Sequence, residues 1–258
     1  MNYGGLNFIF DGIPSEKFGL FLCSVNDTGV KTTEGGGTVT IHTDKTPLMD
    51  YNYLMGVEYD EVFEFTMTFG SHQPKDRFDI SLINNWLIGH SEYKRLQIIQ
   101  HDLTNIYYNC ILNDYKIVTF GNYPYAFECN VICDRQTALG NKRSFKYSNL
   151  GEIKHMNASH SNRLTYPVLK FTTNSPDATL SIINKSNNNW ETKFEGLSNG
   201  ETITLDNQLQ IIKSSTGLFR LENFNKHWFE LVPNMNNLTV TGNVDSITIE
   251  YNEVRKVG

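Results

Sequence analysis

The sequence predicts a mainly β protein of two β-sandwich domains, the first of which carries a single α-helix. Residues 200–251 alternate apolar and polar side chains in short runs, and every break contains Gly, Pro, Asn or Asp. This pattern is typical of half-buried antiparallel strands joined by tight turns. Helical periodicity occurs in only one segment, and a polar, weakly periodic stretch separates two strand-rich parts of the 258-residue chain.

The N-terminal part contains most of its strand-forming residues in seven runs. We predict strands at 6–11, 18–25, 37–42, 60–69, 95–100, 106–119 and 124–133. Gly35–Gly37 come just before one of these runs, where glycine relaxes the backbone at a hairpin or a bulge. No Gly-Lys-Ser/Thr follows them, so they do not predict a phosphate-binding loop.

The helix is predicted over residues 76–89, with Asp76 as its N-cap and Gly89 as its stop. Apolar residues recur at helical spacing and form one stripe: Phe78, Leu82 and Trp86, widened by Ile83 and Leu87. We expect this stripe to pack on a sheet rather than to bind a cofactor. A single helix among many strands, without alternation of the two, argues against a parallel α/β enzyme fold.

Residues 139–165 change in character and are predicted to be a linker between domains. The N-terminal domain is therefore predicted at 1–138 and the C-terminal domain at 166–258. About eight strands between residues 166 and 251 indicate a sandwich or jelly roll for the C-terminal domain.

The charge and hydropathy of the chain limit its partners. The formal net charge is −6, so we expect no specific binding of nucleic acid. A cluster of basic residues within 142–163 is interpreted as part of the solvated linker. No run is apolar and long enough to span a membrane, and Met1–Gly5 lack the features of a signal peptide, so we expect synthesis in a cytoplasm.

No constellation of residues predicts catalysis, a cofactor or a metal. The acidic stretch from Glu58 to Glu64 is expected to be the solvated face of a strand rather than a pair of glycosidase carboxylates. His155 and His160 are expected to form a surface pair without a third metal ligand. The four cysteines are expected to be reduced thiols in the cores, and Cys129 and Cys133 lie too far apart on one strand to bond to each other.

Motifs at both ends of the chain carry a family resemblance. Gly200–Asp206 read GE-x-I-x-LD, residues 224–242 read FN-x-x-W-x-x-L-x-P-x-x-N-x-LTVTG, and residues 247–251 read ITI-x-Y. Near the N-terminus an aromatic strand precedes G-x-x-S at 12–15 and FGL at 18–20. In order and spacing these motifs resemble those of siphophage distal tail proteins, although residues 141–165 match nothing in that pattern.

This resemblance implies a structural protein of the virion, found at the distal tip of the phage tail and assembled in the host cytoplasm. The family's N-terminal domain, with its helix and a projecting hairpin, closes into a hexameric ring. By resemblance, the helix at 76–89 and the glycine-rich hairpin near 30–45 belong to this half. The C-terminal domain is galectin-like. The ring is the hub between the tail tube and the tip proteins: a tail-associated lysin or fibre protein and a receptor-binding protein.

Two other functions are weighed against the hub. A carbohydrate-binding module could stack a host saccharide on Trp190 or Trp228, although both tryptophans are more readily explained as core or corner residues. An enzyme that degrades cell walls would need acid/base or nucleophile residues, and no motif for them is present. We therefore expect a protein that is not an enzyme and uses no cofactor.

Overall fold

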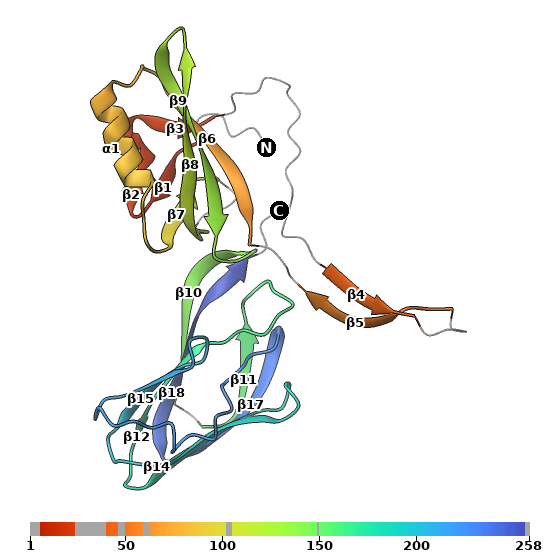
Figure 1. Cartoon of the computed structure of the whole chain (residues 1–258). Coiled ribbons are helices and arrows are strands. Elements are labelled where there is room, and N and C mark those ends of the chain that lie inside the picture. The colour runs from red at the N-terminus through yellow and green to blue at the C-terminus, as the bar shows by residue number, and fades with distance from the viewer. Residues whose placement is uncertain are drawn as a thin grey trace. The chain divides into compact units, whose positions relative to one another are not determined.

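The computed structural model describes residues 6–23, 40–45, 50–58, 62–101, 105–148 and 150–255. The chain divides into two compact units, with the boundary between Leu139 and Gly140 (Figure 1). Strands dominate both units and α1 (Arg77–Leu87) is the α-helix of the described residues, so the predicted fold class is confirmed. Gly35–Gly37 lie outside the described residues.

The N-terminal unit contains an antiparallel seven-stranded sheet in the order β2-β1-β7-β8-β9-β6-β3. A short 3-10 helix, η1 (Ser15–Phe18), connects two of its strands. The strands are β1 (Phe8–Phe10), β2 (Ile13–Pro14), β3 (Leu20–Leu22), β6 (Glu64–Ser71), β7 (Lys94–Ile98), β8 (Tyr108–Phe120) and β9 (Tyr123–Cys133). Two further strands, β4 (Thr40–Asp44) and β5 (Tyr53–Glu58), pair only with each other in the described structure.

The seven-stranded sheet curls until the segment just before β1 reaches β3 at the opposite edge. Leu6 forms an antiparallel bridge with Leu22, and the Leu22 N–H donates to the Leu6 carbonyl at 2.7 Å. Phe8 and Phe69 lie on strands that are four places apart in the sheet order, yet their ring centroids are 5.6 Å apart. Because neighbouring strands are about 4.8 Å apart, this contact requires the sheet to fold over its own core. The result is a sandwich-like unit around a single apolar core.

Helix α1 packs on this core, but not with the whole predicted stripe. The Asp76 side chain accepts from the Asp79 N–H at 2.8 Å, which confirms the N-cap. Ile83, Trp86 and Leu87 are buried, whereas Phe78 and Leu82 are exposed. Each i to i+4 step rotates by about 40° around the helix. The run from Phe78 to Trp86 therefore drifts off the buried face, and the prediction that Phe78 and Leu82 pack on the sheet is wrong.

The C-terminal unit is a sandwich of two antiparallel sheets, in the orders β10-β18-β12-β15-β16 and β11-β17-β13-β14. One contiguous apolar core is formed by residues of both sheets. The strands are β10 (Ala138–Tyr147), β11 (Gly151–Asn157), β12 (Val168–Thr173), β13 (Ala178–Asn184), β14 (Trp190–Leu197), β15 (Thr202–Asp206), β16 (Ile211–Ser214), β17 (Asn234–Gly242) and β18 (Val244–Arg255).

The corner between β17 and β18 requires a glycine. At Gly242, φ is +138° and a Cβ would lie 2.2 Å from the Thr179 carbonyl oxygen. Any side chain there would push β13 away, because no real contact is that short. The final glycine of the LTVTG motif therefore lets the chain pass from one sheet of the sandwich to the other.

The predicted linker at 139–165 is corrected by the structure, because most of it is strand. β10 and β11 are edge strands of the two C-terminal sheets. The segment reads as polar because its basic residues pair with carboxylates of β18: Lys142 lies 3.1 Å from Glu250, and Arg143 donates to Glu253. Edge strands tolerate such residues, and their polarity hid the strands from sequence analysis.

Two of the short alternating runs within 200–251, at residues 218–221 and 229–232, do not form the strands that their pattern predicts. Residues 218–221 are irregular, and 229–232 form only the bridge between Leu231 and Thr165. Buried asparagine side chains fasten the second segment instead: the Asn236 Oδ1 accepts from the Val232 N–H at 2.8 Å, and the Asn207 Oδ1 accepts from the Phe229 N–H at 2.6 Å. These amides satisfy backbone groups that a ladder would otherwise pair.

Candidate functional site

The strongest candidate for a functional surface is the hairpin of β4 and β5, called the arm here. Its register pairs Ile41 with Val57, Thr43 with Leu54 and Asp44 with Tyr53, and a bulge interrupts it after His42. A two-stranded ribbon is marginal by itself in water, because three or more strands or a covering helix are normally needed.

The arm has two chemically different faces. Because side chains alternate along a strand, the register places Ile41, Val57 and Leu54 on one face. His42 and Glu58 lie on the other, where the His42 Nε2 is 3.0 Å from the Glu58 Oε2. The ribbon is therefore amphipathic, with an aliphatic face opposite a polar one.

The aliphatic face is open to solvent. The exposed fractions are 62% for Ile41, 64% for Leu54 and 43% for Val57, and Met55 at the bulge is 69% exposed. Contiguous apolar side chains at the surface of a soluble protein commonly mark an interaction site. Ile41, Leu54, Met55 and Val57 are called the apolar face of the arm below.

In the C-terminal unit, the two tryptophans proposed for saccharide stacking have packing roles. The Trp190 ring is stacked on His227, with centroids 4.6 Å apart and planes 25° apart. Its indole N–H donates to the Trp228 carbonyl at 2.8 Å, and the Trp228 ring packs edge-on against Phe224 at 4.9 Å. Both rings are half-buried. One face of Trp190 is thus already covered, and a sugar-binding role for either residue stays a prediction.

The FN-x-x-W motif covers the edge of β14. The Asn225 N–H donates to the Lys193 carbonyl at 3.0 Å, and the Asn225 side chain accepts from the Lys193 N–H at 3.1 Å. Asn223 likewise donates from its amide to the Glu195 carbonyl at 2.9 Å. The motif therefore closes a sheet edge that would otherwise be open to pairing.

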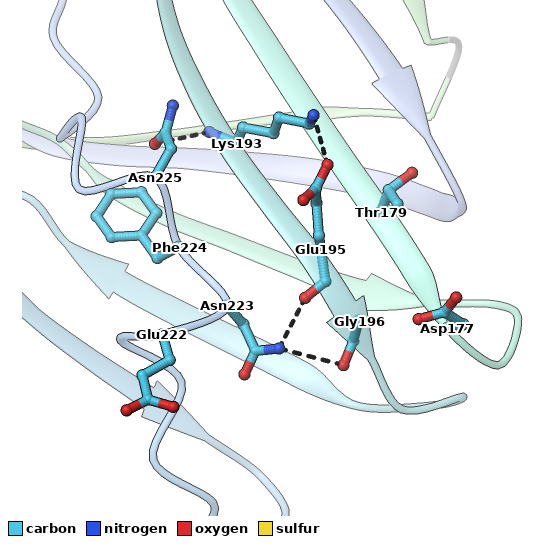
Figure 2. Close-up of a pocket in the computed structure, with 9 residues that line it drawn as sticks. All are labelled: Asp177, Thr179, Lys193, Glu195, Gly196, Glu222, Asn223, Phe224 and Asn225. Atoms are coloured by element: carbon cyan, nitrogen blue, oxygen red, sulfur yellow. Dashed lines mark hydrogen bonds and ion pairs between the residues drawn. The ribbon is translucent and has the colours of Figure 1, made fainter.

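An open pocket of about 640 Å³ lies beside this edge (Figure 2). Figure 2 shows Lys193 directed at Glu195, 2.5 Å away, and Asn223 holding the backbone of β14. Asp177 and Glu222 add further carboxylates to the rim. Phe224, the one aromatic side chain of the lining, is 4% exposed and offers no platform for a sugar ring. The pocket thus lacks the aromatic surface of a typical saccharide site.

A buried ion pair lies close to this pocket, since Arg220 also donates to the pocket residue Asn223 at 3.3 Å. Arg220 donates to both carboxylate oxygens of Glu201, at 2.8 and 2.7 Å, and the Ser198 N–H donates to Glu201 at 2.9 Å. Burial alone would raise the pKa of Glu201, but hydrogen bonds from Arg220, Ser214 and Ser198 outweigh it and lower this pKa to about 2. All its oxygens are engaged, so Glu201 has no capacity left for acid/base chemistry.

The predicted surface pair of histidines is corrected for one member. His155 is buried among Phe145, Tyr147 and Tyr251, and its Nδ1 lies 2.8 Å from the Tyr147 hydroxyl. Burial lowers the pKa of His155 to about 4, so its ring is neutral. His160 lies at the surface against Arg255. The error came from assigning β11 to a linker, since its alternation points His155 into the core.

The cysteines and carboxylates form no metal centre in the part of the chain that the structure describes. Cys110, Cys129 and Cys133 are buried reduced thiols, and burial raises the pKa of Cys129 and Cys133 to about 12. Of the acidic stretch, Asp60 and Glu61 lie outside the described residues. No helix among the described residues has the length and apolar character needed to span a membrane.

The family resemblance implies a hairpin near residues 30–45, a range that includes only one strand of the arm. β5 was missed because Tyr53–Glu58 are almost uniformly apolar, and a short apolar run without alternation does not distinguish a strand from a core segment. The exposure of such a run could not be known without its register.

Comparison with known proteins identifies the family. Residues 3–135 match the model of a phage tail protein N-terminal domain, and residues 138–251 match that of a phage tail C-terminal domain. The gap between these two matches, residues 136–137, lies just before the boundary between the structural units at Leu139 and Gly140. No curated protein sequence matches the chain.

Solved structures share the fold at low sequence identity. The Dit protein of phage SPP1, described as a paradigm of the hub adsorption apparatus in phages that infect Gram-positive bacteria, matches with a TM-score of 0.71 and 12% identity, covering 96% of this chain and 98% of that chain. Two structures of the phage p2 baseplate in its activated conformation match with TM-scores of 0.52 (Sr) and 0.50 (Ca), at 8% and 7% identity. They cover 96% and 86% of this chain and 98% and 88% of theirs, respectively. The resemblance to distal tail proteins is confirmed: the chain belongs to the phage tail protein family and has the fold of a Dit protein.

Proposed function

We propose that this protein is a structural subunit of the phage tail tip and that six copies close into a ring. The ring would be the hub that joins the tail tube to the tail-associated lysin or fibre protein and to the receptor-binding protein. It would be assembled in the host cytoplasm and carried in the virion. The similar solved structures, a hub protein and baseplates, support this role and give no reason to expect catalysis.

The observation that carries the proposal is the apolar face of the arm. Four large aliphatic or thioether side chains are exposed on a ribbon that pairs with no other strand of the described structure. Each such side chain is stabilised by roughly 1.5–3 kcal/mol when it is fully buried. An arm that lies on a neighbouring copy buries this face, and the same contact repeated with a closing rotation yields a ring.

Molar mass in solution tests the ring directly. Gel filtration with light scattering should give about 177 kDa for six copies of the 29.5 kDa chain, and negative-stain images should show rings with an axial channel. A monomer at every concentration up to the solubility limit would contradict self-assembly.

A glycan screen separates the hub from the carbohydrate-binding alternative. We expect the assembled protein to retain no saccharide, because one face of Trp190 is covered by His227 and the pocket of Figure 2 has no exposed aromatic ring. A monomer that binds a glycan, and loses that binding in Trp190→Ala or Trp228→Ala while remaining folded, would establish the alternative instead.

A further inference from the structure

We propose that Cys110 and Cys133 are a site of disulfide formation, at which the open end of the β8–β9 hairpin becomes covalently linked once the protein leaves a reducing cytoplasm. The site itself is argued from the register of two strands and the burial of two thiols. The change of surroundings that triggers the reaction rests on the proposed function, because a virion is released from the host cell.

The two cysteines lie directly opposite each other. β8 and β9 are antiparallel neighbours, and Cys110 is the register partner of Cys133. They form the first pair of this ladder, at the end of the hairpin away from the turn at Gly121 and Asn122. Both side chains belong to the core of the N-terminal unit and are 0% and 1% exposed. The two thiols therefore lie on the same, buried face of the sheet.

The backbone hydrogen bonds show which type of antiparallel pair the cysteines form. The Asp134 N–H donates to the Asn109 carbonyl at 2.9 Å, so Asn109 and Asp134 belong to the hydrogen-bonded type. The Cys133 N–H points away from β8 and donates to the Phe63 carbonyl at 2.9 Å. Because the two types alternate along a ladder, Cys110 and Cys133 are a non-hydrogen-bonded pair.

This type of pair has the spacing that a disulfide requires. Opposed Cα atoms are about 4.5 Å apart in a non-hydrogen-bonded pair, and the side chains approach more closely than in the other type. Cα atoms joined by a disulfide are usually about 4.4–6.8 Å apart. Cys129 lies four residues before Cys133 on the same strand, roughly 13 Å away at about 3.3 Å per residue, and cannot take the place of either partner.

Burial explains how the pair stays reduced while the chain folds. Burial raises the pKa of the Cys110 thiol, and the nearby Cys133 raises it further. Burial likewise raises the pKa of Cys133 to about 12, with smaller contributions from Asp134 and Glu64. The thiolate is the reactive form, so the folded pair reacts slowly. Reaction requires local opening, which is easiest where an element frays, and the pair lies at the end of its ladder.

The reaction is an exchange with a small disulfide such as oxidised glutathione. One cysteine loses its proton to solvent, and its thiolate attacks the small disulfide, which gives a mixed disulfide and one released small thiolate. The second cysteine then loses its proton and displaces the other small thiolate, which forms the bond between Cys110 and Cys133. The two released thiolates take up two protons. Two protein thiols are thus oxidised, and one small disulfide is reduced to two thiols.

The bond would secure the hairpin at both ends. A tight turn already closes one end, and the disulfide closes the loop 110–133 at the other. Such a link removes conformational freedom from the unfolded chain and so favours the folded state. The chain leaves the N-terminal unit shortly after Cys133, at Leu139. The reinforced strand is therefore the one that leads out of this unit.

Peptide mapping without reduction tests the site on the full-length protein. The purified protein is incubated with oxidised glutathione at mildly alkaline pH, its remaining thiols are blocked, and it is digested with trypsin. Lys116 lies between the two cysteines, so the digest releases them on separate peptides. We expect these peptides to be recovered as one linked species that a reducing agent separates.

Cys129→Ala and Cys133→Ala are matched variants. Each removes a buried thiol from the same face of β9, and no Lys or Arg lies between the two positions. The two cysteines consequently share a tryptic peptide, and the variants identify which of them is bonded. Cys129→Ala should keep the linked species and Cys133→Ala should lose it. Circular dichroism checks that both variants are folded.

Urea unfolding provides a second readout. Oxidation should raise the urea concentration at which the N-terminal unit unfolds by roughly 1–2 M in the unmodified protein and in Cys129→Ala. Cys133→Ala should unfold at the same urea concentration with and without the oxidant. A rise of the same size in Cys133→Ala would assign the effect to other groups.

The outcomes separate failure of the disulfide from failure of the hub. Glutathione adducts that persist on Cys110 or Cys133, or two thiols that stay unmodified after the half-buried Cys23 has reacted, overturn the site. Linked peptides already present in cells lysed with a thiol-blocking reagent overturn its redox dependence. A protein that forms rings in oxidant without the linked species overturns the disulfide and leaves the hub intact. A protein that forms the bond but never assembles overturns the proposed function and leaves the site.

Discussion

In the C-terminal unit, the cost of losing one member of an ion pair depends on whether the pair is buried. Glu201 is 1% exposed and accepts from Arg220, Ser214 and Ser198, so its removal leaves a buried guanidinium uncompensated. Surface pairs such as Lys193 with Glu195 are solvated and contribute little. The two kinds of pair predict very different mutational costs.

Glu201→Gln should lower the free energy of unfolding by about 3 kcal/mol, the lower end of the cost of breaking a buried pair. The matched control Glu195→Gln, at an exposed pair, should change it by less than about 1 kcal/mol. Urea denaturation monitored by tryptophan fluorescence measures both. Equal effects would show that the Glu201 pair is screened by solvent after all.

Acid sensitivity should arise from His155. Its pKa is about 4 in the folded protein and about 6.5 in a model peptide. The unfolded state therefore binds more protons between these values, and stability falls as pH is lowered from about 6.5 to about 4.

His155→Phe should remove this contribution. Urea midpoints at pH 7.5, 5.5 and 4.5 should fall more steeply for the unmodified protein than for the variant. His160→Phe, at the surface, is the control and should keep the full pH dependence. Parallel slopes for His155→Phe and the unmodified protein would exclude His155 as the source.

At the scale of elements, asparagine side chains supply the hydrogen bonds that hold the irregular segment 229–232 in place. The Asn236 side chain accepts from the Val232 N–H and donates to the Val232 carbonyl, while the Asn184 amide donates to it at 2.9 Å. One side chain thereby anchors a whole segment that forms no strand.

Asn236→Ala should destabilise the protein by about 1–3 kcal/mol, because it leaves the Val232 N–H unpaired and removes one hydrogen bond each from the Val232 carbonyl and the Asn184 amide. Asn237→Ala, one position along and exposed, should cost less than about 1 kcal/mol. Thermal unfolding followed by circular dichroism compares the two. If Asn236→Ala destabilises the protein no more than Asn237→Ala does, the hydrogen bonds of Asn236 do not hold the segment, and packing of Phe229 and Leu231 does.

Some strands could be predicted from the sequence and others could not. The difference is whether the pattern of side chains within the strand reflects its burial. Strands such as β13, with a strict alternation of buried and half-buried residues, could be predicted because burial itself produces the pattern. β10 could not, since its basic residues are paired with β18, more than a hundred positions away. The exposure of Phe78 and the apolar face of the arm also depend on contacts outside the local sequence, which no periodicity reveals.

The whole molecule combines two buried cores with apolar side chains that remain exposed on the arm. Each unit buries its own core, and Ile41, Leu54, Met55 and Val57 of the arm lie outside both cores. Assembly should therefore be driven by apolar burial rather than by charge.

The ring should consequently be insensitive to salt. Contacts between exposed charges weaken as the screening length falls from about 10 Å at 0.1 M to about 3 Å at 1 M ionic strength. Light scattering at 0.1 M and 1 M NaCl should give the same mass for the assembled protein. Dissociation at high salt would show instead that ion pairs hold the copies together.

The bridge from Leu6 to Leu22 has a consequence for how many copies can join. The bridge pairs the backbone of Leu22 on β3, so this edge of the sheet is already occupied where a strand of another chain could otherwise add. Edge-to-edge addition has no natural end and leads to fibres. A closed edge of this kind therefore favours assembly through side-chain surfaces over open-ended polymerisation at that edge.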